Sequence, residues 1–197
     1  MKIIFATNNQ HKVDEIRSVL PKQIEIITLK EAGIDQDIPE PHDTIEANAV
    51  EKARVIHRLT EQNCFSEDTG LEVVALNGEP GVKSARYAGE DRSPNANIKK
   101  LLHCLKDKEN RSARFKTVIC LILDRKEYLF TGICNGRITE DVNGSEGFGY
   151  DPVFIPDGSD RTFAQMTMEE KNKFSHRRKA TDELVSFLNN LTLNEQY

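Results

Sequence analysis

The sequence lacks the features that mark membrane proteins, disulfide-rich proteins and nucleic-acid-binding proteins. Its 197 residues contain no apolar run near the roughly 18 to 20 residues that a membrane span needs. The four cysteines form no CxxC pair and lie mostly in apolar stretches, which favours buried free thiols in a reducing compartment. The net charge of −5 argues against a broad nucleic-acid-binding surface. We therefore expect a cytoplasmic protein with no membrane and no nucleic-acid partner.

The sequence also lacks a GxxxxGK[ST] motif, which excludes a P-loop protein. It has instead a first strand, a polar turn and an amphipathic helix that Pro21 ends. The N-terminus of such a helix offers free N–H groups and partial positive charge to an anion. The candidate phosphate ligands are therefore Thr7, Asn8, Asn9, Gln10, His11 and Lys12. A simple N-cap role for Asn8 or Asn9 remains the alternative.

Composition and pattern indicate one globular α/β domain over residues 1–197. The hydrophobic share is 38% and the charged share 30%, and no linker separates two domains. Strands are expected at Ile24–Leu29 and Val153–Pro156, and a hairpin from Arg114–Leu123 and Tyr128–Asn135. Helices and strands alternate without a strict βαβ order, which favours a long mixed β-sheet flanked by helices.

An acidic stretch, Ser66-Glu67-Asp68-Thr69-Gly70, separates two strand-like runs. Read as a loop at a strand end, it brings two carboxylates to one place, and Mg²⁺ prefers carboxylate and phosphate oxygens. Asp68 and Glu67 are therefore candidate metal ligands, and Thr69 a candidate substrate contact. A plain turn is the alternative for an Asp-Thr-Gly sequence.

A helix from about Thr44 to Leu59 follows a Pro-containing loop. Asp43 and Glu46 have the spacing of a capping box, with Asp43 as the cap. Glu46 is also a third candidate metal ligand, because it lies in the first turn of this helix. The sequence leaves both roles open for Glu46.

Two late segments are suited to an aromatic base. Glycines flank Phe148 in Gly147-Phe148-Gly149-Tyr150-Asp151-Pro152, so backbone can approach a flat ring on which Phe or Tyr stacks. A second capping box, Thr167 to Glu170, opens a short helix that carries Lys171. A further polar run holds His176 and Arg177. Alternatives remain a core role for Phe148 and a helix-cap role for His176.

Five blocks in order resemble one family. They are T-x-N-x-x-K at Thr7–Lys12, D-[ST]-G at Asp68–Gly70, P-G-x-x-S-A-R-[YF]-[AS]-G at Pro80–Gly89, G-F-G-Y-D-P at Gly147–Pro152, and the pair E-E-K and S-H-R at Glu169–Lys171 and Ser175–Arg177. This pattern resembles the noncanonical purine nucleoside triphosphate pyrophosphatases, the inosine/xanthosine triphosphate pyrophosphatase family. Two positions depart from the family pattern: Glu67 stands where Asp is common, and Arg178 where Gly is common.

The resemblance implies a fold, a reaction and an assembly. It implies two lobes around an active-site cleft, a homodimer, and Mg²⁺-dependent hydrolysis of ITP, dITP and XTP to the monophosphate and pyrophosphate. Asp68 would be the catalytic base and a metal ligand, and Thr7, Asn9, Lys12 and Lys171 would stabilise the leaving pyrophosphate. Asp151, His176 and Arg177, with backbone groups near Phe148 and Gly149, would read the base, and Tyr150 belongs to the same block.

Two other functions fit parts of the pattern. A nucleotide-binding module without catalysis would keep the phosphate and base blocks but would not need the acidic stretch. A Mg²⁺-dependent phosphohydrolase would use the same residues but release orthophosphate. The identity of the product separates these functions.

Overall fold

The chain forms a mixed sheet with helices on its faces, in a computed structural model that describes residues 1–21, 23–36 and 38–194. The strands are β1 (Lys2–Phe5), β2 (Glu25–Thr28), β3 (Cys64–Val73), β4 (Pro80–Gly81), β5 (Ser112–Leu123), β6 (Lys126–Ile138) and β7 (Phe154–Pro156). The α-helices are α1 (Gln10–Arg17), α2 (Ile45–Thr60), α3 (Pro94–Cys104), α4 (Met168–Asn172) and α5 (His176–Asn194). Short 3-10 helices cover Val74–Leu76, Ser84–Arg86, Asp151–Val153 and Phe163–Gln165.

The order of the strands in the sheet is β2-β1-β3-β5-β6-β7, and β4 pairs with β3. β1 runs parallel to β2 and to β3, whereas β4 is antiparallel to β3 and β7 to β6. Helices α1 and α2 make the crossovers between the parallel strands, as parallel pairing requires. The prediction of a mixed sheet flanked by helices is therefore confirmed.

The structure divides into two compact units. Unit 1 comprises Met1–Asp68, Thr117–Gly132 and Arg177–Tyr197, and unit 2 comprises Thr69–Lys116 and Ile133–His176. Each unit has its own apolar core. The strands β3, β5 and β6 each begin in one unit and end in the other.

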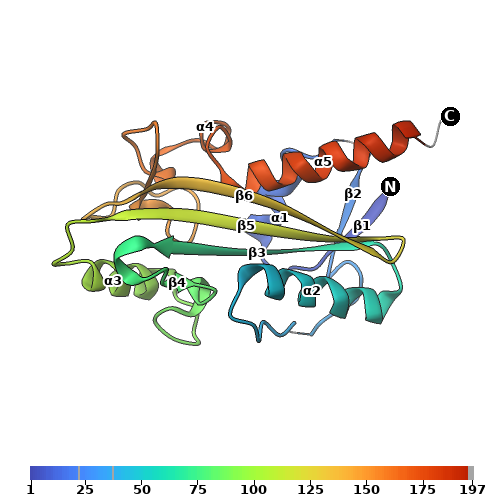
Figure 1. The fold of residues 1–197 in the computed structure, drawn as a ribbon, viewed down its shortest axis with the longest axis horizontal. Coiled ribbons are helices and arrows are strands. Elements are labelled where there is room, and N and C mark those ends of the chain that lie inside the picture. Colours follow the sequence, from blue (N-terminus) through green and yellow to red (C-terminus); the bar gives the residue numbers. More distant parts are fainter. Residues whose placement is uncertain (22, 37, 195–197) are drawn as a thin grey trace. The chain divides into compact units, whose positions relative to one another are not determined.

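Unit 1 buries both faces of its part of the sheet. Phe5 of β1 stacks on Phe65 of β3, and this face packs against Val13 of α1 and Leu184 of α5. The opposite face meets α2, where Cys64 Sγ donates to the Ala53 carbonyl at 3.3 Å. Figure 1 shows α2 and α5 on opposite sides of these strands. Alternate residues of one strand thus point toward different helices.

Unit 2 is built on the other ends of the long strands. Its core combines Leu71 of β3, Leu101 of α3 and Phe115 of β5 with Phe154 and Phe163 from the late segments. Ser93 caps α3 and Pro94 occupies its first turn, where the fixed φ of proline suits a helix. The capping box predicted at Thr167 and Glu170 is also present, and it opens α4.

Several predicted boundaries differ from the structure. The N-cap of α2 is Thr44, whose hydroxyl accepts from the Ala47 N–H, and not Asp43. Helix α1 ends at Arg17, so Val19 and Leu20 lie beyond it. The hairpin strands are longer than expected, because β5 starts at Ser112 and β6 extends to Ile138. Within the described residues, none of the helices combines the length and the apolar character needed to cross a bilayer.

Candidate active site

The acidic stretch is not a loop, because Ser66 to Gly70 lie inside the single long strand β3. That part of the sequence-based interpretation is wrong. Side chains alternate along a strand, so Glu67 points to one face of the sheet, whereas Ser66 and Asp68 point to the other. The hydrogen bonds agree, since Ser66 Oγ donates to the Ala49 carbonyl of α2 and Asp68 contacts Lys52 of α2.

Asp68 belongs to a buried group of one cation and two anions in unit 1. Lys52 Nζ donates to Asp68 Oδ1 at 2.8 Å and to Glu40 Oε1 at 2.7 Å. Burial raises the pKa of Asp68, and Glu40 adds to this effect, against the attraction of Lys52 and Lys12. Burial alone would lower the pKa of Lys52, but attraction to Asp68 and Glu40 raises it overall. One ammonium group therefore contacts two carboxylates, and the excess of negative charge in this group favours the binding of a further cation.

Glu67 anchors a second buried group in unit 1. Arg177 donates from Nε to Glu67 Oε2 at 2.7 Å and from Nη2 to Glu67 Oε1 at 2.9 Å. The third guanidinium nitrogen, Nη1, donates to the carboxylate of Glu15 on α1. Lys12 Nζ lies 3.2 Å from Glu67 Oε1. This bidentate pairing links β3, α1 and the first turn of α5 around one guanidinium.

The predicted phosphate turn is a capped helix start. Asn9 is the N-cap of α1, and its Oδ1 accepts from the Lys12 N–H at 3.4 Å. Thr7 Oγ1 accepts from the Asn9 N–H at 3.1 Å. Asn8, Asn9, Gln10 and His11 are exposed, and Lys12 is half-buried. The start of α1 is accordingly open to solvent, and the ammonium of Lys12 lies beside the acidic strand.

In unit 2, Asp151 organises the glycine-rich segment. Asp151 Oδ2 accepts from the Phe148 N–H at 2.9 Å and from Lys171 Nζ at 2.8 Å. Lys171 Nζ also lies 5.2 Å from the centre of the Phe148 ring, within the range of a cation–π contact. Gly147 has φ +74°, and a Cβ there would lie 2.1 Å from Asp151 Oδ2, so the close approach requires glycine. The half-buried Phe148 ring is thereby placed over a fixed ion pair.

Tyr150 and His176 are both buried in unit 2. The Tyr150 hydroxyl donates to the Ser84 carbonyl at 2.8 Å, and its ring belongs to the core. The His176 imidazole stacks on Phe115, with ring centroids 4.6 Å apart and planes 14° apart. Thr69 lies next to Asp68 in β3, at the first position of unit 2.

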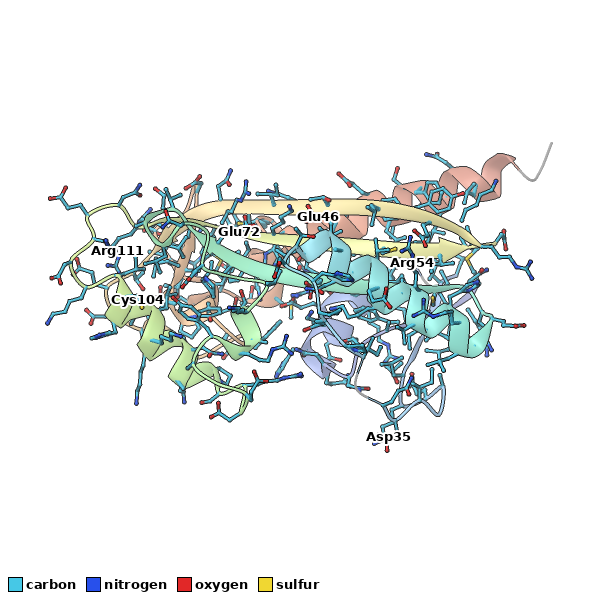
Figure 2. The ribbon with its side chains drawn as sticks, turned by 60° about the horizontal axis from the view of Figure 1, so that its bottom comes forward. Asp35, Glu46, Arg54, Glu72, Cys104 and Arg111 are labelled. Carbon is cyan, nitrogen blue, oxygen red and sulfur yellow. The ribbon has the colours of Figure 1, made fainter. Side chains whose placement is uncertain are left out.

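Two carboxylates suit a hard cation at Asp68. Glu40 and Asp68 contact the same ammonium, so both are within reach of one positive charge. Mg²⁺ typically takes one or two carboxylates and completes its shell with water and phosphate oxygens. No cluster of three or more His, Cys, Asp or Glu side chains suited to a metal occurs among the residues described. Glu46 lies at the start of α2, as Figure 2 shows.

Comparison with known proteins gives a family for this arrangement. A model of the Ham1 family matches residues 3–187. The chain belongs to the Ham1 family. A curated relative from Flavobacterium psychrophilum, named dITP/XTP pyrophosphatase, is 53% identical over 96% of this chain and 100% of its own. Another protein of that name, from Porphyromonas gingivalis, is 50% identical over 95% of this chain and 97% of its own.

Solved structures of Ham1 proteins share the fold. The Ham1 protein of Staphylococcus aureus matches with a TM-score of 0.88 and 40% identity, over 96% of this chain and 99% of that chain. A HAM1 protein from Coxiella burnetii matches with a TM-score of 0.89 and 35% identity, over the same shares. The family resemblance drawn from the five sequence blocks is confirmed.

Sequence reasoning missed three residues of the two buried charged groups: Glu15, Glu40 and Lys52. Glu40 lies between two prolines, which marks a loop but not a ligand. Lys52 carried a usable signal, because it lies on the apolar face of α2 together with Ala49, Ala53 and Ile56, where a lysine requires buried anions. Glu15 similarly neighbours Val13 and Ile16 on the buried side of α1.

Proposed function

We propose that this chain hydrolyses noncanonical purine nucleoside triphosphates such as ITP, dITP and XTP, and so clears them from the nucleotide pool. The reaction is NTP + H₂O → NMP + pyrophosphate. The observation that carries the proposal is the buried carboxylate of Asp68, which shares Lys52 with Glu40 next to Lys12 and the start of α1. Membership of the Ham1 family and the activity for which its relatives are named support it.

The residues of unit 1 are assigned to the triphosphate. Asp68 orients a water toward the α-phosphorus and accepts its proton as the new O–P bond forms. The bond between the α-phosphorus and the bridging oxygen breaks, and negative charge collects on the leaving pyrophosphate. Lys12, the N-terminus of α1 and the hydroxyl of Thr7 stabilise that charge.

We further propose that Mg²⁺ is the cofactor and that Asp68 and Glu40 hold it. When bound, it supplies Lewis-acid polarisation of phosphoryl oxygens and neutralises their charge. Glu40 is favoured over Glu46 because Glu40 shares a cation with Asp68. Glu67 is assigned a supporting role, because it lies on the opposite face of β3 from Asp68 and binds Arg177.

The residues of unit 2 are assigned to the base. Hypoxanthine and xanthine present O6 as an acceptor and N1–H as a donor, whereas adenine reverses both. Fixed partners leave two groups unpaired with adenine, which discriminates on the order of 10⁴-fold. Phe148 provides the stacking surface, Gly149 and its neighbours provide backbone N–H groups, and Asp151 and His176 are polar side chains. Lys171, expected from the sequence to stabilise pyrophosphate, is assigned to the base instead, because it pairs with Asp151 near the Phe148 ring. Arg177, in the first turn of α5, is also assigned to the base although it belongs to unit 1.

Product analysis tests the reaction. The purified chain is incubated with Mg²⁺ and ITP, dITP, XTP, GTP, ATP or UTP, and the products are separated by ion chromatography. We expect pyrophosphate and the monophosphate from ITP and XTP, and a loss of about 10²–10⁴-fold in kcat for Asp68→Asn. Asp35→Asn, at an exposed position visible in Figure 2, is the matched control. Orthophosphate as the first product, or no product, contradicts the proposal.

The metal assignment is tested by Mg²⁺ titration of two isosteric variants. Glu40→Gln removes a carboxylate beside Lys52, so we expect a rise of tenfold or more in the Mg²⁺ concentration for half-maximal activity, on the order of one lost charged ligand. Glu46→Gln, at the start of α2, is expected to leave this concentration within about twofold, because Glu46 acts chiefly at the helix end. The opposite ranking would assign the metal to Glu46.

The family resemblance also supports a homodimer and a cytoplasmic location. Light scattering coupled to size exclusion tests the dimer: a mass near twice 22.4 kDa is expected, and a mass near 22.4 kDa contradicts it.

A further inference from the structure

The face of the His176 ring is covered by an aromatic residue that lies outside the five sequence blocks. Phe115 of β5 stacks on the imidazole, with ring centroids 4.6 Å apart and an interplanar angle of 14°. Phe163 contacts the same imidazole at 6.4 Å and 33°. His176 is 3% exposed, so the contact with Phe115 is part of the packed interior of unit 2.

Phe115 is itself held in place by two further rings. Phe154 meets it edge to face, with centroids 4.6 Å apart and planes 62° apart, and Phe163 stacks on it at 6.2 Å and 21°. Phe154 and Phe163 also contact each other at 5.2 Å. Phe163 lies 5.4 Å from Lys171 Nζ. The three rings thus form one rigid wall behind His176 and Lys171.

A histidine that reads a base must keep its ring in one orientation. A neutral imidazole donates a hydrogen bond from one ring nitrogen and accepts one at the other. If the ring tilts out of this plane, its nitrogens no longer point at the atoms that they serve, and the site loses part of its preference for a 6-oxo group over the 6-amino group of adenine. Stacking on Phe115 opposes this tilt, because the imidazole cannot leave its plane without losing the face-to-face contact.

We propose that Phe115 is a positioning residue that sets base specificity by fixing the plane of the His176 imidazole. This inference rests on the proposed function, in which His176 takes part in reading the base. Phe115 does not touch the base and acts through His176. The prediction therefore concerns discrimination between ITP and ATP, with little change in the hydrolysis of ITP itself.

The test compares kcat/KM for ITP and ATP in single and double variants. Phe115→Leu keeps an apolar side chain but removes the ring, so we expect the ITP-to-ATP ratio to fall about tenfold or more, chiefly through a higher kcat/KM for ATP. Phe115→Tyr retains the ring and should keep the wild-type ratio. Phe154→Leu is the comparison variant: it removes one of the two rings that hold Phe115 but leaves the stack of Phe115 on His176, so we expect the ratio to fall less than in Phe115→Leu.

A double variant separates positioning from general loosening of the core. If Phe115 acts through His176, Phe115→Leu has no further effect on the ratio in a His176→Ala background. An unchanged ratio in folded Phe115→Leu, or an equal fall in both backgrounds, overturns the inference. If Phe115→Leu does not fold, a lowered ratio in folded Phe115→Tyr overturns it equally. An unchanged ratio in His176→Ala would overturn both this inference and the assignment of His176 to the base. The proposed release of pyrophosphate would not be affected by that result.

Discussion

Lys52 is a charged residue whose burial depends on two carboxylates. Its Nζ lies 2.8 Å from Asp68 and 2.7 Å from Glu40, and the side chain is almost fully enclosed. Buried lysines without partners lose their charge, whereas attraction to these carboxylates raises the pKa of Lys52. Lys52 therefore provides the positive charge that both Asp68 and Glu40 contact.

Removal of this ammonium should destabilise the fold strongly. Lys52→Met leaves two neighbouring carboxylates without their counter-ion, and breaking a buried pair in this way costs about 3–5 kcal/mol. Arg54→Met on the same helix, labelled in Figure 2, is the control, since Arg54 pairs with Glu127 at the surface and such a pair contributes about 0–1 kcal/mol. Urea unfolding at pH 7 measures both free energies of unfolding. Equal losses in the free energy of unfolding in the two variants would show that the ion pairs of Lys52 stabilise the fold no more than a surface ion pair does.

At the scale of elements, the sequence predicts most of the helices and strands but not the strand through the acidic stretch. Apolar periodicity gives α2 and the β5–β6 hairpin, because their buried faces repeat at regular spacing. Ser66, Glu67 and Asp68 break that pattern, since polar side chains rarely fill a buried strand. They fit here because Lys52 and Arg177, distant in sequence, supply the opposite charges. The residues near β3 in the sequence therefore do not reveal these partners.

The same reasoning explains what could be predicted of the site. The turn at Thr7–Lys12 and the glycines around Phe148 depend on local backbone geometry, so the spacing of a few neighbouring residues is enough to predict them. The contact of Glu40 and Asp68 with the same Lys52 ammonium depends on the packing of α2 against β3, and no local motif encodes it. Motif matching therefore finds the segments of the site, and the structure is needed to assign the individual carboxylates.

Helix α4 carries Lys171 and begins with a capping box whose glutamate titrates far below its normal range. Hydrogen bonding by Arg161 and by the Thr167 N–H lowers the pKa of Glu170 from 4.5 to about 2. The unfolded chain therefore binds more protons than the native chain between these two values, and stability falls as the pH falls. The stabilisation by Glu170 is present above about pH 4.5 and is lost progressively toward about pH 2.

We accordingly expect Glu170→Gln to be less stable than the wild type at pH 7, with the difference narrowing below pH 4.5. Urea midpoints measured from pH 7 to pH 3 give this difference directly. Glu169→Gln, at the exposed neighbouring position of the same first turn, should stay close to the wild type throughout. A constant difference between Glu170→Gln and the wild type across this range would mean that the carboxylate charge is not what stabilises the start of α4.

At the scale of the whole molecule, neither unit is a continuous piece of chain. The chain passes from one unit to the other at four peptide bonds, after Asp68, Lys116, Gly132 and His176. Three of these bonds lie inside β3, β5 and β6, and the fourth lies in the first turn of α5.

This connectivity predicts a single cooperative unfolding transition. A strand that loses its pairing in one unit frees the residues that continue it in the other, so the two cores should melt together, with equal calorimetric and van't Hoff enthalpies. Lys52→Met, a change confined to unit 1, should lower the midpoint of the whole transition and leave a single peak. Two resolved peaks, with one unmoved by Lys52→Met, would show that the cores unfold separately. Unit 2, assigned to the base, and unit 1, assigned to the phosphates, would then have different unfolding midpoints, and ITP would raise the two midpoints by different amounts.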